Sequence, residues 1–161
     1  MSVTPDPALL TRLQASAEGV QWAARLVEQR QHERLGDEWT ANQHLFHLIA
    51  NEEVFQRRIA EATSAERPAF EKWDSLDHME RNYVPGAGMD RLAAEFVTAR
   101  AQTIQLFGAL QPEDWSRRAV WPDGRDVDIA WIAEKVLWHA LDHYAFLLDL
   151  HGEFEPLQAR G

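Results

Sequence analysis

The sequence contains no cysteine in its 161 residues. Disulfide bonds, thiolate metal ligands and a cysteine nucleophile are therefore excluded. If the protein uses thiol chemistry, the thiol must arrive with the substrate. Lysine is scarce too, since Lys72 and Lys135 are the only two, and the formal net charge is -10. An acidic chain without a basic run repels phosphate backbones, so we exclude nucleic acid as the main partner.

Long hydrophobic runs are also missing. No stretch approaches the ~20 uninterrupted apolar residues of a membrane-spanning helix, and the first residues, MSVTPDPALL, lack a basic region followed by an apolar run. We therefore expect a cytoplasmic protein without a membrane partner. Apolar residues nevertheless make up 45% of the chain, with seven Trp and seven Phe. This composition predicts one compact globular domain, residues 1–161, with a substantial core.

Apolar residues recur three and four positions apart in four separate segments, which is the spacing of amphipathic helices. We predict helices near residues 7–32, 41–62, 89–110 and 128–151. The long connection 63–88 can carry the chain back along the bundle, so that the second and third helices run parallel. No segment shows a convincing strand pattern. The fold class is therefore all-α, a four-helix bundle with one long crossover connection.

Several residues indicate where these helices begin and end. Thr40, followed three residues later by Gln43, forms a capping box before the second helix. Asp90 and Asp128 are candidate N-caps for the third and fourth helices. Gly152 is the expected residue just beyond the end of the fourth helix.

Two histidines share one face of the fourth helix. The predicted buried face runs through Ile129, Ile132, Val136, His139, His143, Phe146 and Leu150. A single imidazole on an apolar face is more often a core histidine bonded to a carbonyl group. A pair at i,i+4, with Cβ atoms roughly 5–6 Å apart, needs several partners, and unpaired buried polar groups cost about 1–3 kcal/mol each. A shared cation would satisfy both imidazoles.

A third ligand should come from a facing helix, and the second helix holds His44 and His47. Taking Leu48 as the centre of its apolar face at ~100° per residue, His44 lies about 40° away and His47 about 100° away. Periodicity alone favours His44 as the more buried histidine. His47 lies at the flank, where a ligand directed at an adjacent helix is still possible.

Other metal and cofactor sites do not fit the spacing. None of the seven histidines follows a glutamate by three residues, as ferritin-like di-iron sites require. Histidines four apart on one helix cannot take opposite faces of a haem iron. The sequence also lacks HExxH, a Walker motif and a dinucleotide fingerprint. What remains is one ion held by His139, His143 and a histidine of the second helix, with a position open for water or substrate.

The order and spacing of these motifs resemble the DinB/YfiT-like superfamily of four-helix-bundle metalloproteins. The resemblance spans nearly the whole chain and rests on Trp39-Thr40, His47-Leu48, Glu52, the turn from Leu110 to Trp115, His139 and His143. It implies that His47, and not His44, completes a metal site with His139 and His143. Zn²⁺ or Ni²⁺ is the expected ion, because imidazole suits both.

The resemblance also implies an activity: metal-dependent transfer that uses a low-molecular-weight thiol as co-substrate and an electrophilic small molecule as substrate. Members often carry Gly-Gln shortly after the second C-terminal histidine, whereas Tyr144-Ala145-Phe146 follows His143 here. This departure leaves the three histidines intact but bears on which thiol and substrate are used. The resemblance, together with seven tryptophans in a small chain, further predicts a homodimer.

Glu52 is the candidate catalytic residue, as a proton acceptor or as a partner of the metal ligands. A buried glutamate is equally consistent with an ion pair. Asp142 and Glu134 are expected to be solvated. The alternative to an enzyme is a metal-binding stress protein in which the ion is structural, and this alternative predicts a closed coordination sphere with no adjoining cavity. A bundle with buried histidines and no metal is the third interpretation.

Overall fold

The computed structural model describes residues 6–155. Four long helices form the bundle, and the chain order of all elements is α1 (Pro7–Val27), η1 (Glu28–Arg30), α2 (Ala41–Ser64), α3 (Ser75–Asn82), α4 (Met89–Gly108), η2 (Pro112–Ser116), β1 (Arg118–Val120), β2 (Asp126–Asp128) and α5 (Ile129–Phe154). Here η denotes a short 3-10 helix. The prediction of an all-α four-helix bundle is confirmed.

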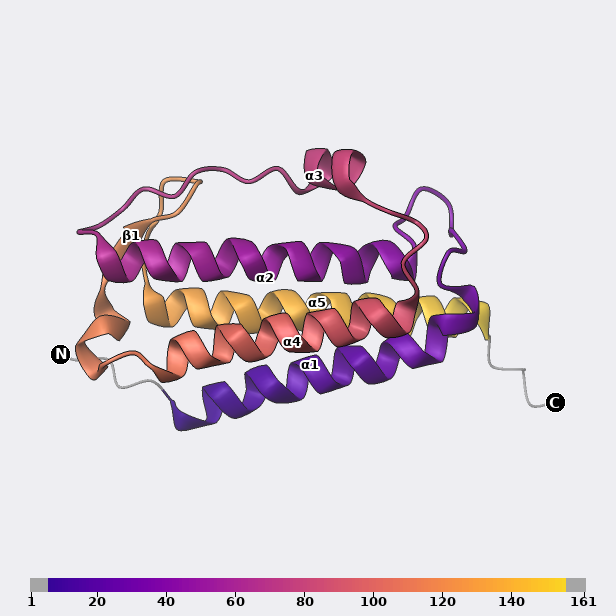
Figure 1. Cartoon of the computed structure of the whole chain (residues 1–161), viewed down its shortest axis with the longest axis horizontal. Helices are drawn as coiled ribbons and strands as arrows, with labels where there is room; N and C mark the ends of the chain where they lie inside the picture. Colours follow the sequence, from indigo (N-terminus) through magenta and orange to yellow (C-terminus); the bar gives the residue numbers. More distant parts are fainter. Residues whose placement is uncertain (1–5, 156–161) are drawn as a thin grey trace.

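The helices do not simply alternate in direction. In Figure 1, α1 and α5 run one way along the bundle, and α2 and α4 both run the other way. The connection after α2 returns along the length of the bundle before α4 begins, so the predicted parallel arrangement of the second and third long helices is confirmed. Within the connection, backbone hydrogen bonds tie Pro68 and Phe70 to Val120 of β1, and α3 follows.

Local sequence explains most helix boundaries. Thr40 and Gln43 form the predicted capping box, in which the Thr40 hydroxyl accepts from the Gln43 N–H and the Gln43 side chain accepts from the Thr40 N–H. Asp128 accepts from the Trp131 N–H and begins α5 as predicted. These two caps matter most here, because α2 and α5 carry the histidines.

Two boundary predictions are wrong. Asp90 is not the N-cap of α4, since Gly88 holds that position without a side-chain bond and Asp90 lies in the first turn. Its carboxylate still suits the positive end of the helix dipole. Gly152 does not end α5, which continues to Phe154. Phe154 is only 7% exposed, so burial of its ring outweighs the roughly 1 kcal/mol that a glycine costs inside a helix.

The segment between α4 and α5 contains a small sheet that the sequence patterns did not predict. β1 and β2 pair antiparallel, with Arg118 opposite Asp128 and Val120 opposite Asp126. A tight turn at 121–124 joins them, and Gly124 adopts φ 89° there, a conformation that glycine adopts without strain. Strands of three residues are too short to show a two-residue alternation, which explains the omission.

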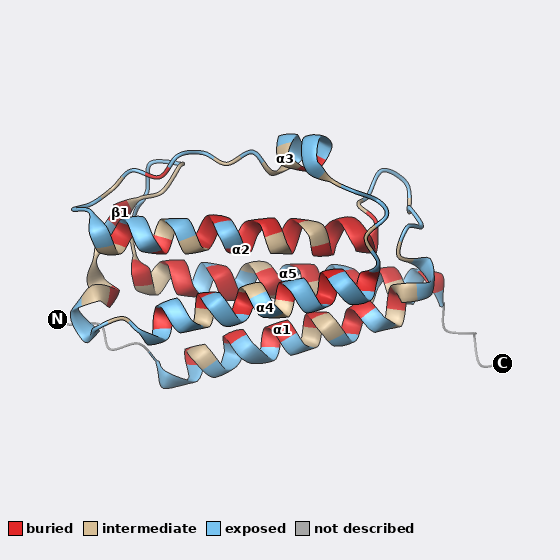
Figure 2. Cartoon of the chain, in the orientation of Figure 1, coloured by how far each residue is buried: buried red, intermediate tan, exposed pale blue. Residues whose placement is uncertain are grey.

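Buried side chains line the inward faces of the four long helices (Figure 2). On α2 the buried residues that follow this face recur three and four positions apart: Ala41, Leu45, Leu48, Glu52, Phe55 and Ile59. On α5 the prediction fails at Phe146, which is 47% exposed, while Ala140 and Leu147 are fully buried. A helix face that alternates three and four residues drifts about 20° per seven residues, so the buried face shifts along a long helix. No helix in the described range is long and apolar enough to cross a membrane.

Candidate metal centre

Two helices, α2 and α5, present histidines to one another close to the end of the bundle where α2 begins. His44 and His47 lie in the first two turns of α2, where the Thr40 capping box fixes the helix start. His139 and His143 lie one turn apart on α5. His47 is 7% exposed and His143 is 7% exposed, whereas His139 is half-buried.

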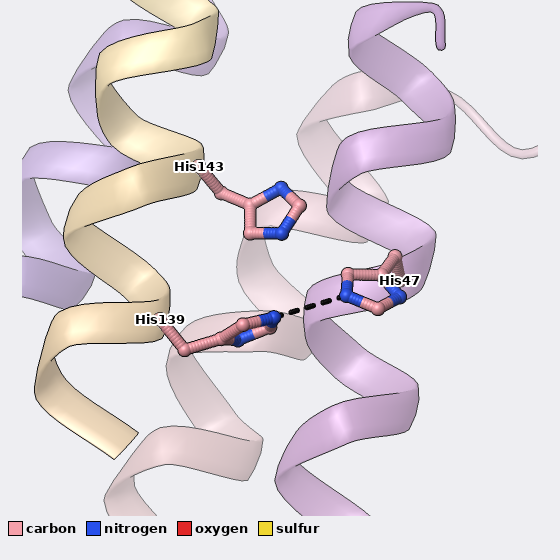
Figure 3. A group of neighbouring side chains, drawn as sticks. All are labelled: His47, His139 and His143. Atoms are coloured by element: carbon pink, nitrogen blue, oxygen red, sulfur yellow. Dashed lines mark hydrogen bonds between the residues drawn. The ribbon is translucent and has the colours of Figure 1, made fainter. Parts of the chain in front are cut away.

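His47, His139 and His143 point into the same space between α2 and α5 (Figure 3). Each can offer one ring nitrogen to a group whose members all lie within 4.8 Å of one another. The Nε2 atoms of His47 and His139 are 3.0 Å apart. Nitrogens bound at about 2.0–2.1 Å to one tetrahedral zinc ion lie roughly 3.4 Å apart. Small movements of the rings would therefore bring the three nitrogens into the coordination sphere of a single ion.

Burial keeps these imidazoles neutral. It lowers the pKa of His47 to about 4, that of His139 to about 3 and that of His143 to about 2, and repulsion from neighbouring imidazoles adds to the effect. The pKa of His44 falls to about 4 through burial. A neutral imidazole has a free lone pair, which a metal ligand requires. At neutral pH the cluster is in the protonation state that binds a cation.

His44 lies behind the three clustered histidines. Its Nδ1 atom is 2.8 Å from Nδ1 of His143, which leaves Nε2 of His143 for the shared space. The periodicity argument predicted the burial of His44 correctly, at 5% exposed. Periodicity underestimated the burial of His47, because residues outside α2 and α5 cover its ring. The structure thus brings His47 into the group that the family resemblance implied.

Aromatic rings from two connections cover His47. The Trp39 ring lies 5.0 Å from the His47 ring between centroids, and Trp73 stacks on His47 at 5.9 Å. Trp73 belongs to the crossover connection, so this connection helps to build the site. His78 is a half-buried residue of α3 that stacks on Phe46, with ring centroids 5.5 Å apart.

Asn51 is a residue of the site that the sequence analysis did not select. Its Nδ2 atom is 2.9 Å from Nε2 of His139 and 3.3 Å from Nε2 of His47. Asn51 lies four residues after His47, which is one turn along the same helix face. This spacing is the sequence feature that could have identified Asn51 as a neighbour of His47. Its N–H groups face the same Nε2 atoms that an ion would occupy, so the Asn51 side chain has to turn aside when an ion binds.

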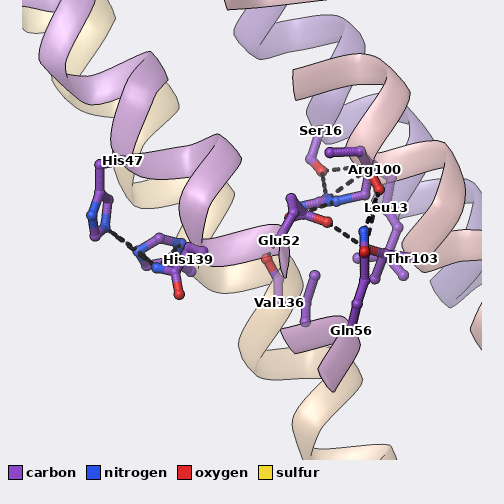
Figure 4. A network of polar contacts seen from close by, with 11 residues as sticks. Leu13, Ser16, His47, Glu52, Gln56, Arg100, Thr103, Val136 and His139 are labelled. Atoms are coloured by element: carbon purple, nitrogen blue, oxygen red, sulfur yellow. Dashed lines mark hydrogen bonds and ion pairs between the residues drawn. The ribbon is translucent and has the colours of Figure 1, made fainter. Parts of the chain in front are cut away.

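Glu52 points away from the histidines and into a separate buried network (Figure 4). Its Oε1 accepts from Arg100 Nη2 at 2.7 Å, and its Oε2 accepts from the Thr103 hydroxyl at 2.6 Å. Arg100 also donates to the Ser16 hydroxyl at 2.8 Å. The contacts of Glu52 are therefore those of an ion-pair residue. Its role as a proton acceptor stays a prediction, and none of its hydrogen bonds within residues 6–155 reaches a histidine.

Comparisons with known proteins agree with this architecture. A sequence profile of the DinB superfamily matches residues 10–147. The structure is similar to YfiT from Bacillus subtilis, with a TM-score of 0.82 and 17% sequence identity over 91% of this chain and 86% of that chain. YfiT is described as a probable metal-dependent hydrolase with an unusual four-helix bundle topology. Curated protein sequences gave no match. Because the family profile covers most of the sequence, the chain belongs to the DinB superfamily.

Proposed function

We propose that His47, His139 and His143 bind one divalent ion, Zn²⁺ or Ni²⁺, and that the protein is a metal-dependent transferase. The co-substrate is a low-molecular-weight thiol, and the substrate is an electrophilic small molecule. One observation carries the metal proposal: three ring nitrogens, one from each of three neutral imidazoles, lie within 4.8 Å of one another. Three neutral ligands leave the charge of a dication uncompensated, which favours binding of an anionic fourth ligand.

The protein's own residues prepare this site for a nucleophile. A bound dication supplies Lewis acidity and lowers the pKa of a coordinated water or thiol. Trp39 and Trp73 cover His47 and limit the access of bulk water. Because the chain has no cysteine, the attacking thiol would be a diffusible molecule.

The cavity beside the cluster supports an enzyme over a purely structural ion. A hollow of about 320 Å³ is lined by Trp39 and His44 among others, and His44 contacts His143 directly. The hollow adjoins the cluster through His44, since none of His47, His139 and His143 is among the described residues that line it. Among the described residues, no further histidine or carboxylate joins the three-nitrogen group.

Hydrolysis is the second candidate function. The observation that favours it is the structural likeness to YfiT, which is described as a probable metal-dependent hydrolase. The same three histidines would serve, with water in place of the thiol. The two functions therefore differ in the nucleophile and not in the metal site.

The test begins with protein purified without a histidine tag and stripped of metal. Titration with Zn²⁺ and Ni²⁺ is expected to give one ion per chain. The loaded protein is then assayed with glutathione, bacillithiol and mycothiol against 1-chloro-2,4-dinitrobenzene, and with p-nitrophenyl acetate in the absence of thiol. Thiol-dependent turnover supports the transferase, whereas thiol-independent ester cleavage supports the hydrolase. One bound ion with no turnover in either assay indicates a structural metal.

A homodimer and a cytoplasmic location are further parts of the proposal. Trp22 and Trp138 are 52% and 61% exposed, which is an unusual amount of exposed aromatic surface for a small chain. A reduced thiol co-substrate is available in the cytoplasm. We expect static light scattering at micromolar concentration to give twice the mass of the 18.5 kDa chain. A mass of one chain would contradict the dimer.

A further inference from the structure

The cavity beside the histidines has the size of a small-molecule pocket. It lies between the connection that precedes α2 and the last turns of α5, and its volume is about 320 Å³. Pockets for small ligands usually begin near 300 Å³. It is therefore large enough for a compact organic molecule.

Negative charge dominates the rim of this cavity. Glu38 comes from the connection, and Asp149 and Glu153 lie one turn apart on α5. Among the described residues that line the cavity, none is Lys or Arg. Within the described part of the chain, no basic side chain forms an ion pair with any of the three carboxylates. Their charge is thus available to a ligand.

The remaining walls are apolar and aromatic. Leu35 and Leu150 face the cavity, together with the rings of Trp39 and Phe146. Phe146 remains 47% exposed although it stacks on the His44 ring at 5.3 Å. An aromatic face attracts a cation as well as an apolar group. Carboxylates beside aromatic walls are therefore complementary to a molecule with a positive charge and an apolar body.

We propose that this cavity binds a small organic cation, an ammonium group attached to an apolar or aromatic body. The walls formed by Trp39 and His44 adjoin the three-histidine cluster, since Trp39 lies 5.0 Å from His47 and His44 contacts His143. A bound amine would then be separated from the proposed metal ligands by the side chains of Trp39 and His44. The identification of this amine as the substrate rests on the proposed function, whereas the binding site itself does not.

The same charges bear on which reactant enters the cavity. Glutathione and bacillithiol carry carboxylates, and like charges at close range repel. The acidic rim therefore disfavours these two thiols and leaves the cavity to the second, amine-bearing reactant. The thiol would approach the histidines from another side.

The test uses metal-free full-length protein and three probes of similar shape: 2-phenylethylammonium, 2-phenylethanol and phenylacetate. Binding is measured by calorimetry and by tryptophan fluorescence. We expect the ammonium compound to bind at least about tenfold more tightly than the alcohol, because it gains charge and cation–π interactions. Its affinity should fall in 1 M NaCl, where the Debye length is only about 3 Å. Equal binding of the alcohol or of phenylacetate would overturn the proposal.

Substitutions locate the binding site. We expect Glu153→Gln to weaken binding of 2-phenylethylammonium about threefold and the double change Asp149→Asn with Glu153→Gln about tenfold. Glu134→Gln is the matched control, because Glu134 is an exposed glutamate of the same helix outside the cavity. If this control weakens binding as much as Glu153→Gln does, the loss of affinity reflects the net charge of the protein, and the proposed site is refuted. Metal titration of the same samples is independent, so an amine-binding protein that binds no metal refutes only the proposed function.

Discussion

Replacing His139 with alanine is expected to abolish metal binding and, with it, any thiol transfer or hydrolysis. His139 contributes one of three clustered nitrogens, and two imidazoles cannot hold an ion against water as three can. The loss of affinity should exceed the ~10–100-fold that follows removal of a residue that only supports a ligand. Titration of Zn²⁺ and Ni²⁺ into the metal-free variant measures it. The fold should survive, because Ile132, Val136 and Leu150 still anchor α5 in the core.

The matched control for this experiment is His44→Ala. His44 is as buried as the proposed ligands, but its Nδ1 atom contacts His143 from outside the three-nitrogen group. We expect this variant to keep most of its metal, with affinity reduced by no more than about 10–100-fold. Should metal content survive the loss of His47 but not that of His44, the choice between these two histidines is wrong. The periodicity of α2 would then have been the better guide.

The histidine site shows what sequence periodicity can predict and what it cannot. The i,i+4 spacing of His139 and His143 was sufficient to predict that they share one helix face. The ranking of His44 above His47 assumed that only the centre of the apolar face is covered. In the structure Trp39 and Trp73, both from connections, cover His47 from the side. Contacts made by irregular segments leave no periodic signal, so the burial of His47 could not be derived from the helix alone.

The buried ion pair shows a second limit. The position of Glu52 on the apolar face predicted its burial, and two roles remained open. Its partner Arg100 was not predicted, although it lies between Phe96 and Thr103 on the buried face of α4. The pairing depends on the packing of α2 against α4, which brings Arg100 Nη2 within 2.7 Å of Glu52 Oε1. That information comes from the topology and not from either helix.

Glu52→Gln tests the contribution of the buried ion pair to stability. If Glu52 is an ion-pair residue, the change leaves the guanidinium of Arg100 buried and uncompensated, with only 1% of its side chain exposed. We expect unfolding free energy to fall by about 3–5 kcal/mol, as for other broken buried ion pairs. Urea denaturation of the metal-free protein measures the loss without involving the histidine site. Arg100→Met is the complementary change and should be similarly destabilising, because it leaves a buried carboxylate.

Removing both charges separates stability from catalysis. The double change Glu52→Leu with Arg100→Met should restore much of the stability that either single change removes, because apolar groups of similar volume can replace a buried pair at little net cost. The loss of hydrogen bonds to Ser16 and Thr103 keeps the recovery incomplete. If Glu52 serves only as an ion-pair residue, the double variant retains metal binding and turnover in the assays above. A double variant that is stable and binds metal but has lost turnover would instead assign Glu52 to the chemistry as a proton acceptor.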